Sequence, residues 1–132
     1  LINNAKLPEG FTMNTDPGRV QQVLINYLTN ACKHTKKGSI TVDASLEENP
    51  GMITFSVTDT GDGIPEEKAE HIFERFTKLN SFVQGTGLGL NICKMVSQKL
   101  KGTVKVDTSY KDGARFVFIH PLDLELTDYT KL

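Results

Sequence analysis

The 132-residue sequence lacks the features of secreted, membrane-spanning and strongly charged chains. Its apolar runs are too short to cross a bilayer, and its N-terminus has no basic segment followed by an apolar one. Its 15 Lys and Arg nearly balance 16 Asp and Glu, so no net charge favours nucleic acid or an anionic membrane surface. We therefore expect a cytoplasmic domain, and the sequence leaves open whether a longer parent protein is membrane-anchored.

Cysteine is also scarce, and no metal-ligand spacing of cysteine and histidine occurs. Cys32 and Cys93 are far apart, and each lies inside a helical pattern. Such cysteines predict two buried thiols in a reducing compartment rather than a disulfide framework.

What is present is a series of helical and alternating hydrophobic patterns. Asp16 followed by Pro17 predicts the N-cap and first residue of a helix, whose basic last turn and Gly38 indicate its end. Alternation of apolar and polar residues predicts strands, and the turns between them favour hairpins. The expected elements are a short strand at residues 11–14, helices at 17–37, 65–73 and 88–100, and strands at 40–44, 53–57, 103–107 and 114–119.

These patterns predict an α+β fold, a two-layer sandwich with three helices on one face of a mixed, mostly antiparallel sheet of about five strands. We expect a single domain over residues 1–132, with its core at about 16–121. Residues 74–84 have no clear period and predict a mobile loop, whereas the acidic tail after Pro121 predicts a frayed end.

The first long helix carries a second, polar stripe. Asn26, Asn30 and Lys33 fall at i, i+4 and i+7, roughly opposite the apolar stripe. A solvated polar face is the simpler interpretation, but asparagine is a poor residue for a helix interior. Mg²⁺ prefers oxygen ligands and is usually completed by substrate phosphates, so an amide oxygen beside a lysine is also typical of a phosphate site.

Asp59 stands where a strand turns into the glycine-rich segment Gly61-Asp62-Gly63. A carboxylate there could accept a hydrogen bond from the exocyclic amine of adenine, whereas guanine presents a carbonyl at the equivalent position. An Asx-turn, in which the carboxylate binds its own loop, would satisfy the same residues. Both interpretations remain open at this point.

A second glycine cluster, Gly85-Thr86-Gly87-Leu88-Gly89, leads directly into a helical pattern. It is neither the Rossmann fingerprint nor a P-loop, because the spacing differs from both. It predicts either a flexible loop or a lid hinge that grips phosphate at a helix N-terminus. Phe73 and Phe76 are expected to anchor the preceding loop to the core, and Lys78 could reach phosphate or stay solvated.

In this order the motifs resemble the catalytic, ATP-binding domain of two-component sensor histidine kinases. That domain has the Bergerat-type ATP-binding fold shared with gyrase, the ninety-kilodalton heat-shock chaperone and the mismatch-repair ATPases. Residues 16–35 look like the family's N box, 59–63 like its G1 box, 73–76 like its F box and 85–90 like its G2 box. One departure is His34, where the N box usually carries Phe or Tyr.

The resemblance implies ATP and Mg²⁺ as cofactors, with Asn30 as the metal ligand and Asn30 and Lys33 as the catalytic residues. It implies that Asp59 binds the adenine amine, that Gly61 and Gly63 shape the base pocket, and that the second cluster forms a lid hinge at the triphosphate. The cofactor-binding residues implied in this way are Asn26, Asn30, Lys33, His34, Asp59, Gly61, Gly63, Ile64, Lys78, Gly85, Thr86, Gly87, Leu88 and Gly89.

The implied reaction is transfer of the ATP γ-phosphoryl group to a histidine on a separate dimerisation domain of the same kinase. None of His34, His71 and His120 is followed by the Glu or Asp that such an acceptor carries. We therefore expect a fragment of a larger kinase that hydrolyses little ATP alone, with a downstream response regulator as a further partner. The sensed signal, the regulator, any phosphatase activity and a following receiver domain are not readable from the sequence.

Two other functions fit parts of the pattern. An anti-sigma-factor serine kinase or a stand-alone ATPase of the chaperone or mismatch-repair kind would share the fold, but the F box and the tight G-T-G-L-G-L segment argue against both. A degenerate docking module would have lost ATP, yet Asn30, Asp59 and all five box glycines are intact.

Overall fold

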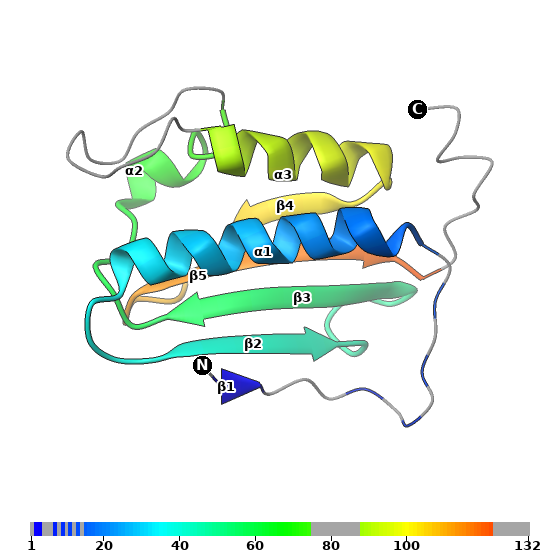
Figure 1. The fold of residues 1–132 in the computed structure, drawn as a ribbon, viewed down its shortest axis with the longest axis horizontal. Helices are drawn as coiled ribbons and strands as arrows, with labels where there is room; N and C mark the ends of the chain where they lie inside the picture. The colour runs from blue at the N-terminus through cyan, green and yellow to red at the C-terminus, as the bar shows by residue number, and fades with distance from the viewer. Residues whose placement is uncertain are drawn as a thin grey trace.

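The computed structural model describes residues 2–3, 7, 9, 11, 13, 15–74 and 88–122. Within them a single mixed sheet has the strand order β1-β2-β3-β5-β4 (Figure 1). The strands are β1 (Ile2–Asn3), β2 (Ile40–Ser45), β3 (Met52–Asp59), β4 (Thr103–Val106) and β5 (Ala114–Pro121). The helices are α1 (Pro17–His34), α2 (Glu66–Ala69) and α3 (Leu88–Lys99).

The sheet is mostly antiparallel, as predicted. β3 pairs antiparallel with β2 on one side and with β5 on the other, and β4 pairs antiparallel with β5. β1 is the parallel exception and pairs with β2 through Ile2 and Asn3. The strand predicted at residues 11–14 is wrong, because Phe11 and Met13 lie outside any strand and β1 occupies the edge of β2 instead. An alternation of four residues was too short to identify which segment pairs.

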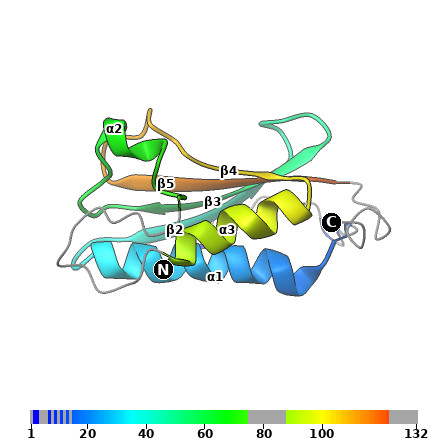
Figure 2. The same ribbon diagram turned by 90° about the horizontal axis from the view of Figure 1, so that it is seen from above.

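α1 and α3 lie side by side on one face of the sheet (Figures 1 and 2). The α+β two-layer fold predicted from the sequence is thereby confirmed. α2 is a single short turn at the end of the sheet, outside the layer that α1 and α3 form (Figure 2). None of the described helices combines the length and hydrophobicity that a membrane span requires.

The apolar stripes of α1 and α3 form the core with the inner face of β3 and β5. Tyr27 is fully buried, and its ring lies tilted against that of Phe116 with 5.3 Å between the centroids. Its hydroxyl donates a hydrogen bond to the Val117 carbonyl at 2.8 Å. Phe73 packs edge-on against Phe116 at 6.1 Å, which confirms its predicted role as an anchor. Burying aromatic surface and satisfying the one polar tip stabilises this centre.

The two cysteines differ, so the prediction of two buried thiols is half wrong. Cys93 is buried in α3, and burial raises the pKa of its thiol to about 12. Cys32 is exposed, because it follows the buried Ala31 and a helix turns by about 100° per residue.

α1 begins as predicted and ends earlier. The Asp16 side chain caps the helix by accepting hydrogen bonds from the Gly18 and Arg19 amides at 3.1 and 3.3 Å. The last helical residue is His34, because Thr35 is already extended with φ −118° and ψ 96°. The sequence predicted Lys36 and Lys37 in the last turn of this helix. The basic residues in the last turn are instead Lys33 and His34.

The segment that enters α1 is tied to the end of β5. His120 is fully buried, its Nδ1 lies 2.6 Å from the Pro121 carbonyl oxygen, and its Nε2 lies 2.7 Å from the Thr15 hydroxyl. A carbonyl can only accept, so Nδ1 carries the proton and Nε2 of the neutral ring accepts from Thr15. Burial lowers the pKa of His120.

Candidate functional site

The candidate site lies at the end of the sheet where α1 and β3 finish and β5 begins (Figure 1). The connection from β3 to α2, residues 60–65, is called the first glycine loop below. It reaches both the C-terminal end of α1 and the β4–β5 hairpin, residues 107–113. Residues far apart in the sequence are therefore brought together around Asp59, the last residue of β3.

Asp59 has one bonded and one unbonded carboxylate oxygen. The residue is 1% exposed, and Oδ1 accepts hydrogen bonds from the Gly61 amide at 2.9 Å and the Ala114 amide at 3.2 Å. Oδ2 is buried and has no hydrogen-bond partner among the described residues. The Asx-turn interpretation is therefore correct for Oδ1, whereas Oδ2 is left unpaired within the described part of the chain. An unsatisfied buried carboxylate oxygen is costly, so a ligand that donates to it gains affinity.

Gly61 fixes the first glycine loop against α1. A Cβ at this position would lie 2.1 Å from the His34 carbonyl oxygen, so only glycine allows the two backbones to approach so closely. Beside it, Thr60 pairs with Ser39: the Ser39 amide donates to Thr60 Oγ1 at 2.9 Å, and the Thr60 amide donates to the Ser39 carbonyl at 3.1 Å. The loop is thus attached both to the last residue of α1 and to Ser39 in the segment that follows the helix.

Gly63 fixes the other side of the loop against the β4–β5 hairpin. Its φ is +76°, and a Cβ there would lie 3.0 Å from the Gly113 carbonyl oxygen. A Cβ at Gly113 would lie 1.9 Å from the Asp59 carbonyl oxygen, so this second glycine is equally required. Gly63 and Gly113 therefore pack closely together, and Gly113 packs against the backbone of Asp59.

The polar stripe of α1, residues Asn26, Asn30 and Lys33, runs toward the C-terminal end of this helix, where the candidate site lies. Asn26 is half-buried, and its Nδ2 donates to the Gly89 carbonyl of α3 at 3.1 Å, which joins the two helices. Asn30 and His34 are half-buried and Lys33 is exposed. Among the described residues, none forms a hydrogen bond with the Asn30 side chain.

The second glycine cluster is described only where it enters α3. Lys78, Gly85, Thr86, Gly87 and the anchor Phe76 lie outside the described residues, as does most of the predicted mobile loop. Leu88 is the first residue of α3. Gly89 is exposed, and a Cβ there would meet nothing within 4 Å. The described part of the molecule therefore gives no steric reason for a glycine at this position.

Two residues of the site were not singled out from the sequence. Gly113 and Ala114 were read only as the end of a turn and the start of a strand, yet both contact Asp59. The pairing of Asp59 with Ala114 in the β3–β5 ladder explains this contact. A single sequence shows the turn at Asp112-Gly113 but not which strand end it faces.

The fold and site define a two-layer α+β domain with a polar site at one end of its sheet. Over residues 15–124 the chain matches the family described as histidine kinase-, DNA gyrase B- and HSP90-like ATPase. The chain belongs to this family.

Curated relatives are sensor kinases by name. The adaptive-response sensory kinase SasA of Nostoc sp. is 38% identical over 109 residues, which are 81% of this chain and 27% of that protein. The autoinducer 2 sensor kinase/phosphatase LuxQ of Vibrio cholerae is 35% identical over 94% of this chain and 15% of its own length. This chain therefore spans about a quarter or less of the length of these relatives.

Solved structures agree with this assignment. Full-length ShkA in complex with AMPPNP has a TM-score of 0.75 and 36% identity, covering 94% of this chain and 25% of that one. The catalytic domain of the histidine kinase ThkA has a TM-score of 0.78 and 31% identity, covering 92% of this chain and 80% of that one. The fold is therefore that of histidine kinase catalytic domains.

Proposed function

We propose that this chain is the ATP-binding catalytic domain of a sensor histidine kinase. It would transfer the γ-phosphoryl group of ATP to a histidine on the dimerisation domain of the same kinase, from which a response regulator would receive it. The observation that carries the proposal is the buried Oδ2 of Asp59, which no described residue hydrogen-bonds. The names of the relatives and the AMPPNP bound to ShkA support the same assignment.

Asp59 would select the base. Oδ1 is held by two backbone amides, one in the first glycine loop and one at the start of β5, so the carboxylate cannot rotate freely and Oδ2 keeps one direction. An adenine amine would donate to Oδ2, whereas the carbonyl oxygen of guanine would face another acceptor and be repelled. Gly61, Gly63 and Ile64 would shape the base pocket around this contact.

Asn30 would hold Mg²⁺ through its amide oxygen, and the ATP phosphates would complete the coordination. Bound Mg²⁺ would neutralise phosphate charge during transfer. Within the described residues no cluster of three or more His, Cys, Asp or Glu could hold a metal. Lys33, one turn further along α1, would offset further phosphate charge, and Asn26 and His34 would lie beside the phosphates.

The protein's part in the reaction is positioning. Phosphoryl transfer needs little covalent chemistry from the enzyme, so holding the γ-phosphate in line with the acceptor supplies most of the catalysis. Because that acceptor is proposed to be on another domain, we expect little steady ATP hydrolysis by this chain alone. Robust phosphate release by the isolated chain would contradict the assignment to histidine kinases and favour a stand-alone ATPase.

Base selection can be tested by calorimetry with ATP and GTP. Asp59→Asn keeps an oxygen for the Gly61 and Ala114 amides but replaces Oδ2 by a donor, which opposes the adenine amine. We expect ATP affinity to fall about 10- to 100-fold, the range for a lost hydrogen bond to a charged group, and GTP affinity not to fall. Asp43→Asn on the opposite face of the sheet makes the same chemical change and should bind ATP as the unmodified chain does. Equal losses for ATP and GTP in Asp59→Asn would remove the base-selection role.

The metal site can be tested in the same titration with and without Mg²⁺. Asn30→Ala should abolish the gain in ATP affinity that Mg²⁺ provides and leave metal-free binding nearly unchanged. Thr29→Ala, an exposed neighbour on α1, should retain the Mg²⁺ effect. An undiminished Mg²⁺ effect in Asn30→Ala would assign the metal to other residues.

A further inference from the structure

The side-chain amide of Asn26 joins α1 to the first turn of α3. Its Nδ2 donates a hydrogen bond to the Gly89 carbonyl at 3.1 Å. Gly89 is the second residue of α3, so its carbonyl also accepts the backbone amide one turn further along the helix. A carbonyl oxygen has two lone pairs and can accept both bonds. Asn26 therefore holds the turn in which α3 begins.

The same amide nitrogen also faces Cys93 of α3. Burial raises the pKa of the Cys93 thiol to about 12, and a hydrogen bond from the Asn26 side chain acts in the opposite direction. Only a donor lowers a thiol pKa, because it stabilises the thiolate, so the nitrogen of the amide and not its oxygen faces the sulfur. The amide carries two N–H hydrogens, and Gly89 and Cys93 account for both.

The Cys93 thiol returns the connection to α1. Its Sγ donates to the Val23 carbonyl at 3.7 Å. Val23 and Asn26 are three residues apart on α1, and Gly89 and Cys93 are four apart on α3, so each pair lies on one face of its helix. Val23 and Cys93 are fully buried. The hydrogen bonds thus run from α1 to α3 and back, and they fix the orientation of the Asn26 amide.

This orientation leaves Asn26 without a donor for phosphate. Phosphate oxygens only accept hydrogen bonds, and the remaining Oδ1 of Asn26 is an acceptor too. Resemblance alone places this side chain among the residues that bind the nucleotide. The first backbone amides of a helix, by contrast, have no partner within the helix and hold anions well. Those of α3 belong to Leu88, Gly89 and Leu90, in the turn that Asn26 holds.

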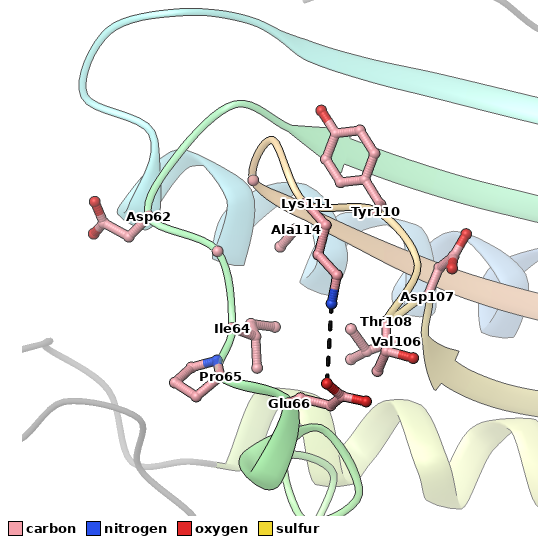
Figure 3. A pocket seen from close by; sticks show the side chains of 12 residues that line it. Asp62, Ile64, Pro65, Glu66, Val106, Asp107, Thr108, Tyr110, Lys111 and Ala114 are labelled. Atoms are coloured by element: carbon pink, nitrogen blue, oxygen red, sulfur yellow. Dashed lines mark ion pairs between the residues drawn. The ribbon is translucent and has the colours of Figure 1, made fainter.

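The base is expected at a different place. Gly63 and Ile64, proposed to shape the base pocket, line a cavity of about 300 Å³ between the first glycine loop and the β4–β5 hairpin (Figure 3). The described lining of this cavity contains no residue of α1 or α3. A change in the contact between these helices should therefore act on phosphate binding and spare the base.

We propose that Asn26 is a positioning residue, which sets the first turn of α3 against α1 and thereby fixes the backbone amides that bind the ATP phosphates. Asn26 itself does not donate to the phosphates. This role rests on the proposed nucleotide function, whereas the hydrogen bonds to α3 do not. It also gives the buried Cys93 a part in phosphate binding.

The contact with α3 can be tested in the nucleotide-free chain by hydrogen exchange. Asn26→Ala should speed exchange of the Ile92 and Cys93 amides, which close the first turn of α3, about 3- to 10-fold, the range for one lost neutral hydrogen bond. Gln22→Ala removes another half-buried amide side chain one turn earlier on α1 and should not affect them. Unchanged exchange at both amides in Asn26→Ala would overturn the positioning role.

The effect on phosphate can be separated from the base by NMR titration with adenosine and with ATP. Asn26→Ala should weaken ATP binding about 3- to 10-fold and leave adenosine binding unchanged. Equal losses for the two ligands would place the effect at the base and contradict the proposal. If the unmodified chain bound neither ligand, the nucleotide function and the phosphate role would fail together, while hydrogen exchange would still decide whether Asn26 holds α3.

Positioning through α3 and direct contact with phosphate are distinguished at Cys93. Cys93→Ala removes one acceptor of the Asn26 amide, so it should weaken ATP binding by itself and add little to the effect of Asn26→Ala. Cys93→Ser keeps a group that accepts from Asn26 and donates to Val23, and should bind ATP as the unmodified chain does.

The control for a general loss of packing is Val96→Ala. Val96 is buried further along α3, so its truncation should lower stability but not ATP affinity. A Cys93→Ala chain with the ATP affinity of the unmodified chain, or full addition of the Cys93→Ala and Asn26→Ala losses, would show that Asn26 acts on the phosphates directly.

Discussion

Gly61 is where the backbones of α1 and the first glycine loop meet. The residue has an ordinary backbone conformation, so its requirement for glycine comes from contact: the position of a Cβ is already occupied by the His34 carbonyl. Resemblance alone assigns Gly61 to shaping a base pocket. The structure adds that it joins the polar helix to the loop that carries Asp59.

Substitution of Gly61 should separate these two parts. Gly61→Ala places a methyl 2.1 Å from a backbone oxygen, which cannot move independently of α1. We expect unfolding free energy to fall by about 1–3 kcal/mol in urea titrations, with weaker ATP binding by the folded fraction. Gly18→Ala is the matched control, because its Cβ would make an ordinary 3.5 Å contact and should stabilise α1 by up to about 1 kcal/mol. Wild-type stability in Gly61→Ala would show that the loop can move away from α1 at little cost.

For single residues, the sequence predicted the turn made by the Asp59 carboxylate but not the other residues that contact it. A carboxylate at the end of a strand, followed by glycines, indicated either a turn or a base contact; Oδ1 makes the turn, and the base contact of Oδ2 stays a prediction. Gly113 and Ala114 could not be predicted, because their contact with Asp59 depends on the register of β3 against β5. Cys32 was misplaced for a related reason, since the apolar stripe fixes which face is buried only to within one residue.

Among the elements, α3 is held to α1 close to its first turn. The Asn26 side chain donates to the Gly89 carbonyl, and the Cys93 thiol lies 3.7 Å from the Val23 carbonyl. These contacts place the start of α3 beside the polar stripe of α1. Helix N-termini bind anions through free amides, so this placement supports a phosphate position between the two helices.

Gly89 provides a test at the level of the helix. Because a Cβ there would meet nothing within 4 Å, Gly89→Ala should not destabilise the domain and should raise its melting temperature slightly through better helix propensity. If phosphate approaches this backbone closely, the same variant should bind ATP several-fold more weakly by calorimetry. Gly18→Ala, in the first turn of α1, should stabilise without affecting ATP. An unchanged ATP affinity in Gly89→Ala would mean that phosphate does not approach this turn.

Helix and strand positions were largely predictable from periodicity, and their ends were not. α3 and β5 start at the predicted residues, Leu88 and Ala114. α1 stops at His34 rather than near Gly38, because the chain must turn early enough to bring Ser39 to Thr60. Such ends are decided by tertiary contacts that no local pattern contains.

For the molecule as a whole, His120 and Thr15 connect the chain where it enters α1 with the chain where it leaves β5. Since the lowered pKa of His120 keeps the buried ring neutral, the unfolded chain takes up a proton at a higher pH than the folded domain does. Stability should therefore be complete above the ordinary histidine pKa and should decrease as the pH falls through it.

This dependence can be measured by urea unfolding between pH 5 and pH 8. His120→Gln should lower stability at neutral pH but flatten the loss between pH 7 and pH 5. His71 acts in the opposite direction, because its hydrogen bond to Glu74 raises its pKa, so its contribution is present at low pH and lost as the pH rises. His71→Gln should therefore leave the loss at low pH in place or make it steeper. A His120→Gln chain with the wild-type pH dependence would assign the effect to other groups.

β3 has a hydrogen-bonded neighbour on each side, β2 along six residues and β5 along all eight. Amide hydrogens in such a strand exchange with solvent only in the rarest openings of a domain. Asp59 ends this strand, so the group proposed to read the base is already ordered before any ligand arrives. Little conformational entropy remains to be lost at that contact, and discrimination between bases should persist at temperatures close to unfolding.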